Sequence, residues 1–174
     1  MQILINFILV VATIAGMELL SWFIHKYLFH GPLWFIHKSH HQVNHSTFEL
    51  NDVFSLGFGV AAIWLIIQGL PQSDYRLWLG VGISIYGIIY FVFHDGFIHR
   101  RFNTIQFRGR YLLAIRRAHK IHHKSLRKSP SSEFGLLFPS FENFKALKTN
   151  KNSFHLVSKN IDASDPGKRS TQKS

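Results

Sequence analysis

Ten of the twelve histidines in this chain fall into four short groups whose spacing suits metal binding. The first and third groups have the pattern HxxxxH, and the second and fourth have the pattern HxxHH. In order along the chain the groups are His25 and His30; His37, His40 and His41; His94 and His99; and His119, His122 and His123. A single buried histidine is more often a hydrogen-bonded core residue than a ligand, but four regular groups favour a metal site.

Helical spacing decides which imidazoles can meet. In each HxxHH group, positions i, i+3 and i+4 lie within about 100° of arc, so three imidazoles can point at one metal. The two positions of an HxxxxH pair lie about 140° apart on an ideal helix. These pairs therefore suit either two neighbouring metals or a helix that unwinds between its ligands. Gly31 and Pro32, after the first pair, and Gly96, inside the second pair, favour unwinding.

The available donor atoms limit which metal ions can bind but do not identify the ion. The chain has no cysteine, which excludes disulfides, thiolate sites and iron–sulfur clusters. A structural zinc uses four ligands, usually with sulfur, whereas ten histidines can give roughly five nitrogens to each of two ions. Imidazole suits zinc, copper, iron and nickel alike, so ligand type alone leaves the metal open.

Three apolar segments have the length and composition of membrane spans, at 3–23, 53–70 and 77–93. Glu18 is the only Asp, Glu, Lys, Arg or His residue within them. We therefore predict an all-α integral membrane helical bundle with three spans, with four as the alternative. The membrane-embedded domain is expected to cover 1–149, and the polar remainder, 150–174, is expected to be a disordered tail.

The distribution of positive charge orients the spans. Of the 20 Lys and Arg residues, only Arg76 falls in the connection between the second and third spans. Basic segments stay in the cytoplasm, so we predict a multi-pass protein of the cell (inner) membrane with its N-terminus outside. Two spans separate the first and third histidine groups, so all four groups reach the cytoplasmic face. The net charge of +11 would also suit a nucleic-acid protein, but the long apolar runs argue against one.

Two acidic residues are predicted to orient ligand histidines. Glu18 lies on the same helical face as Trp22 and His25, and we expect it to accept an N–H from a ligand imidazole. The alternative for Glu18 is a pair with a neighbouring helix. Asp95 directly follows His94 and is expected to accept an imidazole N–H in the same way. We expect no catalytic residue beyond the metal ligands and no organic cofactor.

Other residues have more local expected roles. Asn51 is placed to reach a metal-bound water, and Asp52 is expected to cap the N-terminus of the second span. A stripe of small residues for close helix contact is predicted at Gly80, Ser84 and Gly87. Beyond the spans we expect a helix at 111–124. An interfacial segment is expected at 135–138, Phe141 and Phe144.

The order of the four groups resembles the fatty acid hydroxylase superfamily of membrane di-iron enzymes. The sequences around the groups are similar to those of the bacterial-type β-carotene 3-hydroxylases. The matching stretches are HKYLFHGPLW at 25–34, FELNDV at 48–53, YGIIY at 86–90, VFHDGFIHR at 92–100, AHKIHH at 118–123 and FGLLF at 134–138. The resemblance runs from about residue 18 to residue 139. The stretch 42–47 departs from the Pro- and Arg-containing run of the family, which leaves the role of His45 open.

The resemblance implies a reaction. All ten grouped histidines would bind two ferrous ions, and O2 would be the co-substrate in hydroxylation of β-ionone rings at carbon 3. β-Carotene would pass through β-cryptoxanthin to zeaxanthin. The electrons would come from a ferredoxin-type donor with its reductase, since the chain has no flavin, haem or iron–sulfur module. The basic face would offer this donor a docking surface, or it would contact anionic lipid.

Such a substrate would come from the lipid bilayer. Its way in is expected to be lined by Phe54, Phe58, Tyr90, Phe91 and Phe93. The alternatives are a related oxygenase that acts on a sterol, a fatty acyl chain or another carotenoid position, and the chemically close desaturation. A metal transporter is the alternative from another class, but it would place polar ligands along a pore within the spans. The oligomeric state stays open.

Overall fold

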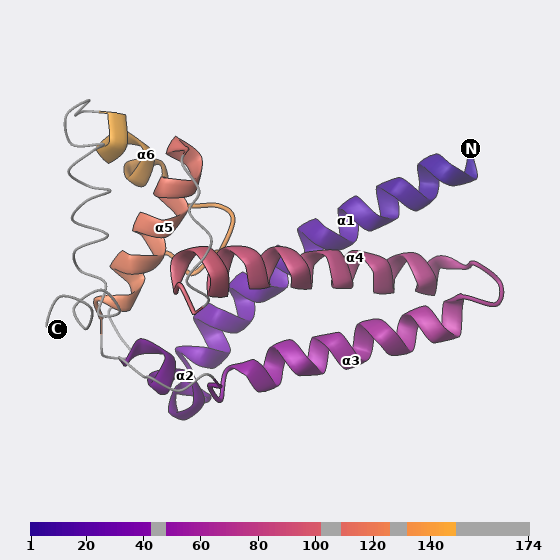
Figure 1. Cartoon of the computed structure of the whole chain (residues 1–174), viewed down its shortest axis with the longest axis horizontal. Coiled ribbons are helices and arrows are strands. Elements are labelled where there is room, and N and C mark those ends of the chain that lie inside the picture. The colour runs from indigo at the N-terminus through magenta and orange to yellow at the C-terminus, as the bar shows by residue number, and fades with distance from the viewer. Residues whose placement is uncertain (43–47, 102–108, 126–131, 149–174) are drawn as a thin grey trace, which may run out of the picture.

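The computed structural model describes residues 1–42, 48–101, 109–125 and 132–148. Within these ranges every regular element is a helix, which confirms the all-α prediction (Figure 1). The elements are α1 Gln2–Phe23, the π-helix η1 Ile24–Phe29, α2 Trp34–His41, α3 Asp52–Gly69, α4 Tyr75–Tyr90, the π-helix η2 Phe91–Ile98, α5 Arg110–His123 and α6 Phe141–Lys148. The expected tail and the two ungrouped histidines, His45 and His155, lie outside the described residues.

Three helical stretches are long and apolar enough to cross a membrane, namely Gln2–Phe29, Asp52–Gly69 and Tyr75–Ile98. The first and third of them each consist of an α-helix prolonged by a π-helix. Large apolar side chains on their surfaces are exposed, such as Phe7 on α1 at 65% and Ile63 on α3 at 59%, as expected for helices that face lipid. The three predicted spans are confirmed, and the described ranges contain no fourth.

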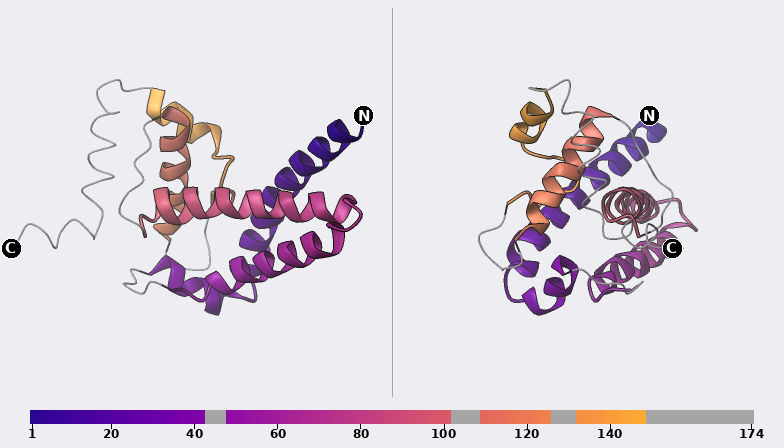
Figure 2. Two further views of the ribbon diagram at one scale, coloured as in Figure 1. Left: turned by 45° about the vertical axis from the view of Figure 1, so that its right-hand side comes forward. Right: turned by 60° about the vertical axis from the view of Figure 1, so that its left-hand side comes forward.

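α3 and α4 form a hairpin, and α1 packs against α4 (Figure 1, Figure 2). Two glycines on different faces of α4 allow both contacts. A Cβ on Gly80 would lie 2.7 Å from the Ala62 carbonyl oxygen of α3. A Cβ on Gly82 would lie 2.6 Å from Thr13 Cβ of α1. Larger residues at either position would push the helices apart.

The predicted stripe of small residues on α4 is only partly correct. Gly80 makes the close contact, but a Cβ on Gly87 would meet no atom within 4 Å. The Ser84 hydroxyl donates a hydrogen bond within its own helix, to the Gly80 carbonyl oxygen. Ser84 and Gly87 line a cavity, because α3 and α4 separate as they run away from their connection.

The connection between α3 and α4 is tight. A Cβ on Gly69 would lie 2.1 Å from the Leu77 backbone nitrogen, so this crossing requires glycine. The Asp74 carboxylate caps α4 by accepting from the Arg76 backbone N–H at 2.9 Å, and it also pairs with the Arg76 guanidinium at 2.6 Å. These contacts fix the hairpin at the end of the molecule far from the histidines.

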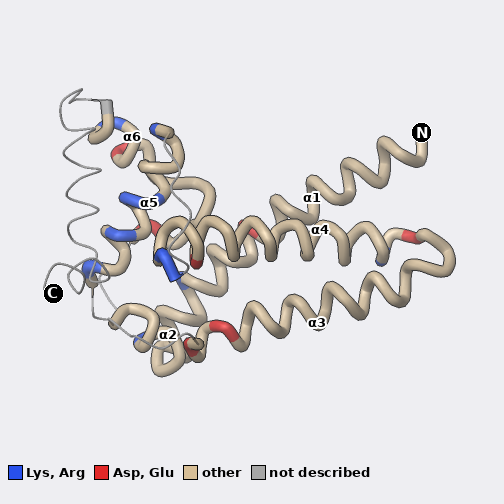
Figure 3. Tube along the Cα trace, in the orientation of Figure 1, with Lys and Arg blue, Asp and Glu red and all other residues tan. Residues whose placement is uncertain are grey.

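α2, α5 and α6 gather at the opposite end of the bundle from this connection (Figure 1). Lys and Arg residues are concentrated at the same end (Figure 3). A small core holds α5 against η2, and it consists of Phe97, Ile98, Ile115 and Leu136. α5 confirms the helix predicted at 111–124, within one residue at each end.

The predicted interfacial segment is divided between the core and the surface. Leu136 is buried in the core, and Phe144 packs against Leu113 and Leu147. Phe138 and Phe141 are 76% and 70% exposed. These two aromatic side chains suit contact with a membrane surface, whereas Phe144 and Leu147 hold α6 on α5.

Candidate metal centre

Nine of the ten grouped histidines gather in two compact clusters near the basic end of the bundle. Within each cluster the potential ligand atoms all lie within 4.8 Å of one another. The first cluster consists of His25, His30, His37, His41 and His122. The second cluster consists of His40, His94, His99 and His119. Two clusters agree with the expectation of two metal ions.

His123, the tenth histidine, lies against the second cluster. Its ring centroid lies 4.7, 4.8 and 4.6 Å from those of His40, His99 and His119 respectively. Its Nε2 atom is buried and has no hydrogen-bond partner. A buried nitrogen that is left without a proton donor, among other imidazoles, is a suitable ligand for a cation.

The π-helices explain how each HxxxxH pair can serve a single cluster. The His30 backbone N–H donates to the His25 carbonyl at 3.0 Å, and the His99 N–H donates to the His94 carbonyl at 2.9 Å. These i→i+5 bonds widen the turn, which brings both histidines of a pair to the same side. Of the two sequence-based alternatives, unwinding is therefore correct. Gly31 assists it, because a Cβ there would lie 1.8 Å from the Tyr27 carbonyl oxygen.

The HxxHH helices divide their histidines between the two clusters. In α2, His37 and His41 belong to the first cluster and His40 to the second. In α5, His122 belongs to the first cluster and His119 to the second. Helical spacing would allow all three imidazoles of an HxxHH group to share one metal, but the structure divides them between the two clusters. Adjacent helical positions differ by about 100°, which is enough to direct side chains at sites on either side.

This division follows the repeat in the sequence. Each HxxxxH pair belongs to the same cluster as the first histidine of the HxxHH group that follows it. The middle histidine of that HxxHH group belongs to the other cluster. His40 thus crosses to the second cluster and His122 to the first. His123 occupies the position in α5 that His41 occupies in α2, and their rings stack 4.5 Å apart. His41 belongs to the same cluster as the HxxxxH pair before it, so the corresponding His123 is assigned to the second cluster with His94 and His99.

Four histidines of the first cluster turn Nδ1 outward to an oxygen atom. The pairs are His25 with the Phe134 carbonyl at 2.8 Å, His37 with the Asn51 amide oxygen at 3.3 Å, His41 with the Ser125 carbonyl at 2.9 Å and His122 with the Ser132 carbonyl at 2.7 Å. Because these oxygens only accept hydrogen bonds, each Nδ1 carries the proton and each Nε2 presents a lone pair inward. The protein thereby fixes the tautomer that a metal needs.

The inward-facing nitrogens lie very close together. His37 Nε2 lies 3.0 Å from His25 Nε2 and 3.1 Å from His41 Nε2. With the protons on Nδ1, these contacts set lone pair against lone pair, and a cation between them removes the repulsion. Two nitrogens bound at about 2.1 Å and at a right angle are about 3.0 Å apart, so the spacing fits ligands of one metal.

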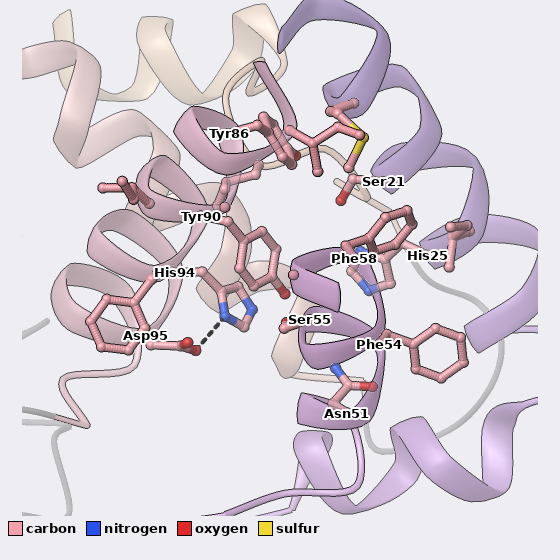
Figure 4. Close-up of a pocket in the computed structure, with 18 of the residues that line it drawn as sticks. Ser21, His25, Asn51, Phe54, Ser55, Phe58, Tyr86, Tyr90, His94 and Asp95 are labelled. Carbon is pink, nitrogen blue, oxygen red and sulfur yellow. Dashed lines mark hydrogen bonds and ion pairs between the residues drawn. The ribbon is translucent and has the colours of Figure 1, made fainter. Parts of the chain in front are cut away.

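Carboxylates, in place of neutral oxygens, hold two histidines of the second cluster. Glu49 accepts from His40 Nδ1 at 2.6 Å, and Asp95 accepts from His94 Nδ1 at 2.8 Å (Figure 4). The hydrogen bond expected of Asp95 is therefore present. A carboxylate partner raises the basicity of an imidazole more than a carbonyl does. The two clusters consequently offer electronically different sites to their metals.

Arg101 joins the acidic residues behind the second cluster. Its guanidinium nitrogens lie 2.9 Å from Asp52, 3.5 Å from Asp95 and 3.8 Å from Glu49. Burial raises the pKa of the Glu49 carboxyl, and the positive charge of Arg101 opposes that shift. The prediction that Asp52 caps α3 is wrong, because Asp52 is the first helical residue and its carboxylate accepts from Arg101 and from the Glu49 backbone N–H.

Glu18 is buried as a functional residue would be, but its partners differ from the expected ones. Its carboxylate accepts from the Tyr86 hydroxyl at 2.8 Å and from the Leu136 and Leu137 backbone N–H groups at 3.0 and 2.8 Å. The prediction that it accepts from a ligand histidine is therefore wrong. Glu18 anchors the loop before α6 to α1 and α4, and this loop supplies the carbonyl that holds His25.

Three further residues near the clusters make contacts that were not predicted. Asn51 accepts from His37 Nδ1, and its expected contact with a metal-bound water stays a prediction. Glu49 and Arg101 were missed as site residues. Glu49 lies in the FELNDV stretch, whose resemblance to the family was the available signal, and Arg101 directly follows VFHDGFIHR.

Burial keeps most of the imidazoles in and beside the two clusters neutral. Desolvation, followed by repulsion from neighbouring histidines, lowers the pKa of His37 to about 2, of His122 to about 3 and of His41 to about 4. The same causes hold the pKa values of other cluster residues well below the usual range, namely His40, His99, His119 and His123. Neutral imidazoles are the form that binds metal, so the site is ready for it at physiological pH.

A cavity of about 420 Å³ lies among α1, α3 and α4 and reaches both clusters (Figure 4). His25 and His37 of the first cluster and His94 and His119 of the second line one end of it. The remaining wall is mainly apolar. This volume falls within the roughly 300–1,000 Å³ typical of small-molecule sites.

Four of the five aromatic residues predicted to line the way in do so, namely Phe54, Phe58, Tyr90 and Phe91. Phe93 does not line the cavity, because it packs against the core that contains Phe97 and Ile115. Figure 4 shows Tyr90 and Phe58 on opposite sides of the cavity, contributed by α4 and α3. The cavity thus places an aromatic wall beside the histidines.

Residues 10–145, a range that contains all ten grouped histidines, match the family described as "Fatty acid hydroxylase". The chain belongs to the fatty acid hydroxylase family. Membership in this family sets aside the metal transporter alternative.

Within the family, the chain is similar to several curated β-carotene hydroxylases. It is 38% identical over 136 residues to a "Beta-carotene hydroxylase" of a Paracoccus strain, covering 76% of this chain and 83% of the relative. It is 37% identical over 137 residues to that of Pseudescherichia vulneris, covering 78% and 77%. It is also 37% identical over 123 residues to a chloroplastic "Beta-carotene 3-hydroxylase 2" of Arabidopsis thaliana, covering 68% and 41%. No solved structure matches the chain.

Proposed function

We propose that this protein hydroxylates the β-ionone rings of β-carotene at carbon 3, giving β-cryptoxanthin and then zeaxanthin. The observation that carries the proposal is an apolar cavity within the spans that ends on histidines of both clusters. A hydrocarbon dissolved in the bilayer can reach such a cavity without passing through water. The similarity to β-carotene hydroxylases over most of the chain supports a carotenoid as that hydrocarbon.

Two ferrous ions are the proposed cofactors, one in each cluster, and O2 is the proposed co-substrate. The first cluster would hold one ion, and the second cluster together with His123 would hold the other. When bound, the ions supply the oxidising chemistry needed to replace an unactivated C–H bond by a C–OH group. The facing Nε2 atoms of the first cluster and the buried, unpartnered Nε2 atoms of His40 and His123 support the fit.

The side chains around the cavity position the substrate and exclude water. The Tyr90 ring stacks on the His94 ring with centroids 4.5 Å apart, so an aromatic surface lies directly beside the second cluster. Phe54 and Phe58 face it from α3. A cyclohexene ring would be held between these surfaces with one edge toward the histidines. Exclusion of water keeps the oxidising equivalents for the substrate.

The reaction also needs an external reductant. One atom of O2 enters the product as the hydroxyl group, and the other leaves as water after taking up two electrons and two protons. A chain without cysteine cannot hold an iron–sulfur cluster of its own. We therefore propose a ferredoxin-type donor with its reductase. The basic end of the molecule, which carries Lys38 on α2, Lys120 on α5 and Lys124 directly after α5, supports docking of an acidic donor (Figure 3).

The same charge distribution supports the proposed location. Lys and Arg residues gather at the end that carries the histidines (Figure 3), whereas Arg76, in the first turn of α4, lies beside the connection between α3 and α4. By the positive-inside rule, we propose that the metal centre lies on the cytoplasmic side of the cell (inner) membrane and that the N-terminus lies outside.

Expression in cells that accumulate β-carotene and supply a ferredoxin and its reductase tests this function. We expect monohydroxylated and dihydroxylated products with the mass of β-cryptoxanthin and zeaxanthin, with oxygen derived from 18O2. His40→Ala and His122→Ala should abolish product, whereas His155→Ala, at a histidine outside the four groups, is the control. Unchanged carotene, with an active donor and correctly inserted protein, would reject a carotenoid substrate. Hydroxylated sterol or fatty acid in its place would assign the alternative substrate.

A further inference from the structure

α3 and α4 touch near their connection and separate toward the metal centre. At Gly80 a Cβ would lie 2.7 Å from the Ala62 carbonyl oxygen across the interface. At Gly59 and Gly87, nearer the histidines, a Cβ would meet no atom within 4 Å. Both of these glycines line the cavity. The space between the two helices is therefore open at Gly59 and Gly87.

This part of the cavity also opens at the surface of the spans. Gly59 and Gly87 are exposed, and so are their cavity-lining neighbours Ile88 and Phe91, at 64% and 50%. On the α1 side, by contrast, Met17 lines the cavity and is only partly exposed. Since these surfaces belong to membrane-spanning helices, the mouth between α3 and α4 faces lipid.

The distance from the histidines to this mouth sets a length requirement. Gly87 and His94 lie seven residues apart, and Gly87 is therefore about 10 Å along the helix from the second cluster. A single six-membered ring that reacts at the histidines ends well before Gly87. A ring that carries a long hydrocarbon chain must send that chain past Gly87 and Gly59 into the lipid.

We propose that Gly59 and Gly87 determine the length of substrate that this enzyme accepts, and that the substrate enters sideways from the bilayer between α3 and α4. The proposal rests on the function proposed above and specifies its substrate class as a ring that ends a long, extended apolar chain. The missing side chains at positions 59 and 87 leave room for this chain. A leucine at either position would project into the mouth and block the chain but leave the ring end of the cavity unchanged.

The chain offers closely matched controls. A Cβ on Gly57 or Gly16 would also meet no atom within 4 Å, and neither residue lines the cavity. Gly57→Leu changes the same helix as Gly59→Leu, two residues away, and adds the same apolar volume toward lipid. Each leucine also removes one helix-interior glycine, so propensity effects on stability cancel in the comparison.

The test compares a long and a short substrate in the iron-loaded, full-length protein. Wild type, Gly59→Leu, Gly87→Leu, Gly57→Leu and Gly16→Leu are given β-carotene and β-ionone in competition, and the ratio of hydroxylated products is measured. We expect this ratio to fall by roughly tenfold or more in the two cavity variants, the scale of discrimination by a blocked apolar pocket. The two controls should keep the wild-type ratio. Gly59→Ala and Gly87→Ala provide milder versions in which the ratio should fall less.

Retention of β-carotene by the purified protein gives a second readout that does not depend on turnover. Visible absorption should show less bound carotenoid in Gly59→Leu and Gly87→Leu than in Gly57→Leu, at equal iron content. Wild-type product ratios together with wild-type carotenoid retention in both cavity variants would overturn the inference. If wild-type protein hydroxylates neither substrate, the proposed function fails, and carotenoid retention alone then decides whether these glycines control access.

Discussion

Arg101 forms a two-pronged ion pair with Asp52, with its terminal nitrogens 3.0 and 2.9 Å from the two carboxylate oxygens. The pair lies behind the second cluster only. Arg101 also approaches Glu49 and Asp95, and each of these carboxylates holds one histidine of that cluster. One cation therefore keeps several buried carboxylates in place. In the first cluster, by contrast, oxygens without formal charge hold His25, His37, His41 and His122.

Replacing Arg101 should consequently weaken one metal site and spare the other. Without the guanidinium, Glu49 and Asp95 repel each other and release His40 and His94. We expect Arg101→Ala to lower metal affinity at the second site by roughly 10–100-fold, the usual effect of losing an outer partner of a ligand. Metal content measured against protein should fall from two ions toward one per chain in dilute chelator.

Arg110→Ala is the control for this prediction, because it removes an exposed positive charge at the start of α5. It should keep wild-type metal content. Equal loss of both ions in Arg101→Ala would show that Arg101 supports the whole fold and not one site. Arg101→Lys should restore only part of the affinity, since an ammonium cannot make the two-pronged contact.

Glu18 should act through the loop that it anchors. Glu18→Ala leaves two buried backbone N–H groups and the Tyr86 hydroxyl without their acceptor, at a cost of about 1–3 kcal/mol for each group left unpaired. The loop would shift and carry away the carbonyl that holds His25. We expect a lower melting temperature and a loss of metal from the first cluster. Glu18→Gln should retain most of the thermal stability and most of the metal. Its amide oxygen can still accept from the two N–H groups, and its NH2 can donate to Tyr86.

Tyr86→Phe separates the two contributions of Glu18. It removes the hydroxyl contact but leaves the backbone N–H groups of Leu136 and Leu137 paired with the carboxylate. Metal content should stay at the wild-type level, with a drop in stability of about 1 kcal/mol. A loss of metal in Glu18→Gln as large as in Glu18→Ala would instead show that the negative charge itself is required.

The π-turn at the first HxxxxH pair should depend on Gly31. Any side chain there collides with the Tyr27 carbonyl oxygen, so Gly31→Ala must rearrange the turn that brings His25 and His30 together. We expect a destabilisation of about 1–3 kcal/mol, measured by thermal unfolding in detergent, and loss of metal from the first cluster. Gly16→Ala is the matched control, because its Cβ meets no atom within 4 Å. Wild-type metal binding in Gly31→Ala would reject the role of this turn.

The metal-free protein should lose stability as the pH falls. The folded-state pKa values of His37, His41 and His122 lie near 2, 4 and 3, below the unfolded value of about 6.5. The unfolded chain then binds more protons, so the contribution of these groups is present above pH 6.5 and declines below it. Each histidine should lower the free energy of unfolding by about 1.4 kcal/mol per pH unit as the pH falls from about 6 to about 5. A melting temperature that stays constant over this range would contradict the prediction.

The main outline of the site could be predicted because it depends on local patterns. Hydrophobic length identified the three spans, and the number of spans between the first and third histidine groups put them at one end. The division of α2 between two clusters could not be predicted, because i+3 and i+4 positions both lie within the arc that a single metal can use. Only the position of the second ligand set decides that His40 turns away from His37 and His41.

The misassigned residues share a different cause. Glu18 lies on the helical face of His25, and a pattern on one helix cannot show that its carboxylate is taken by backbone groups 118 and 119 residues away. The pairing of Arg101 with Asp52 likewise spans 49 residues and follows from how η2 and α3 meet. Polar partners that arise from tertiary packing leave no periodic trace in the sequence.

The exchange of middle histidines has a consequence for assembly. His40 lies in the first half of the chain but belongs to the cluster formed mainly by the second half. His122 lies in the second half but belongs to the cluster formed mainly by the first half. Neither half therefore contains a complete set of ligands, and each bound ion would act as a cross-link between the two halves. α2 and α5, whose imidazoles stack at His41 and His123, are the elements that these cross-links would fasten. Metal loading would then be the final closing step of folding, and a chelator would loosen the contact between α2 and α5 before it disturbed the spans.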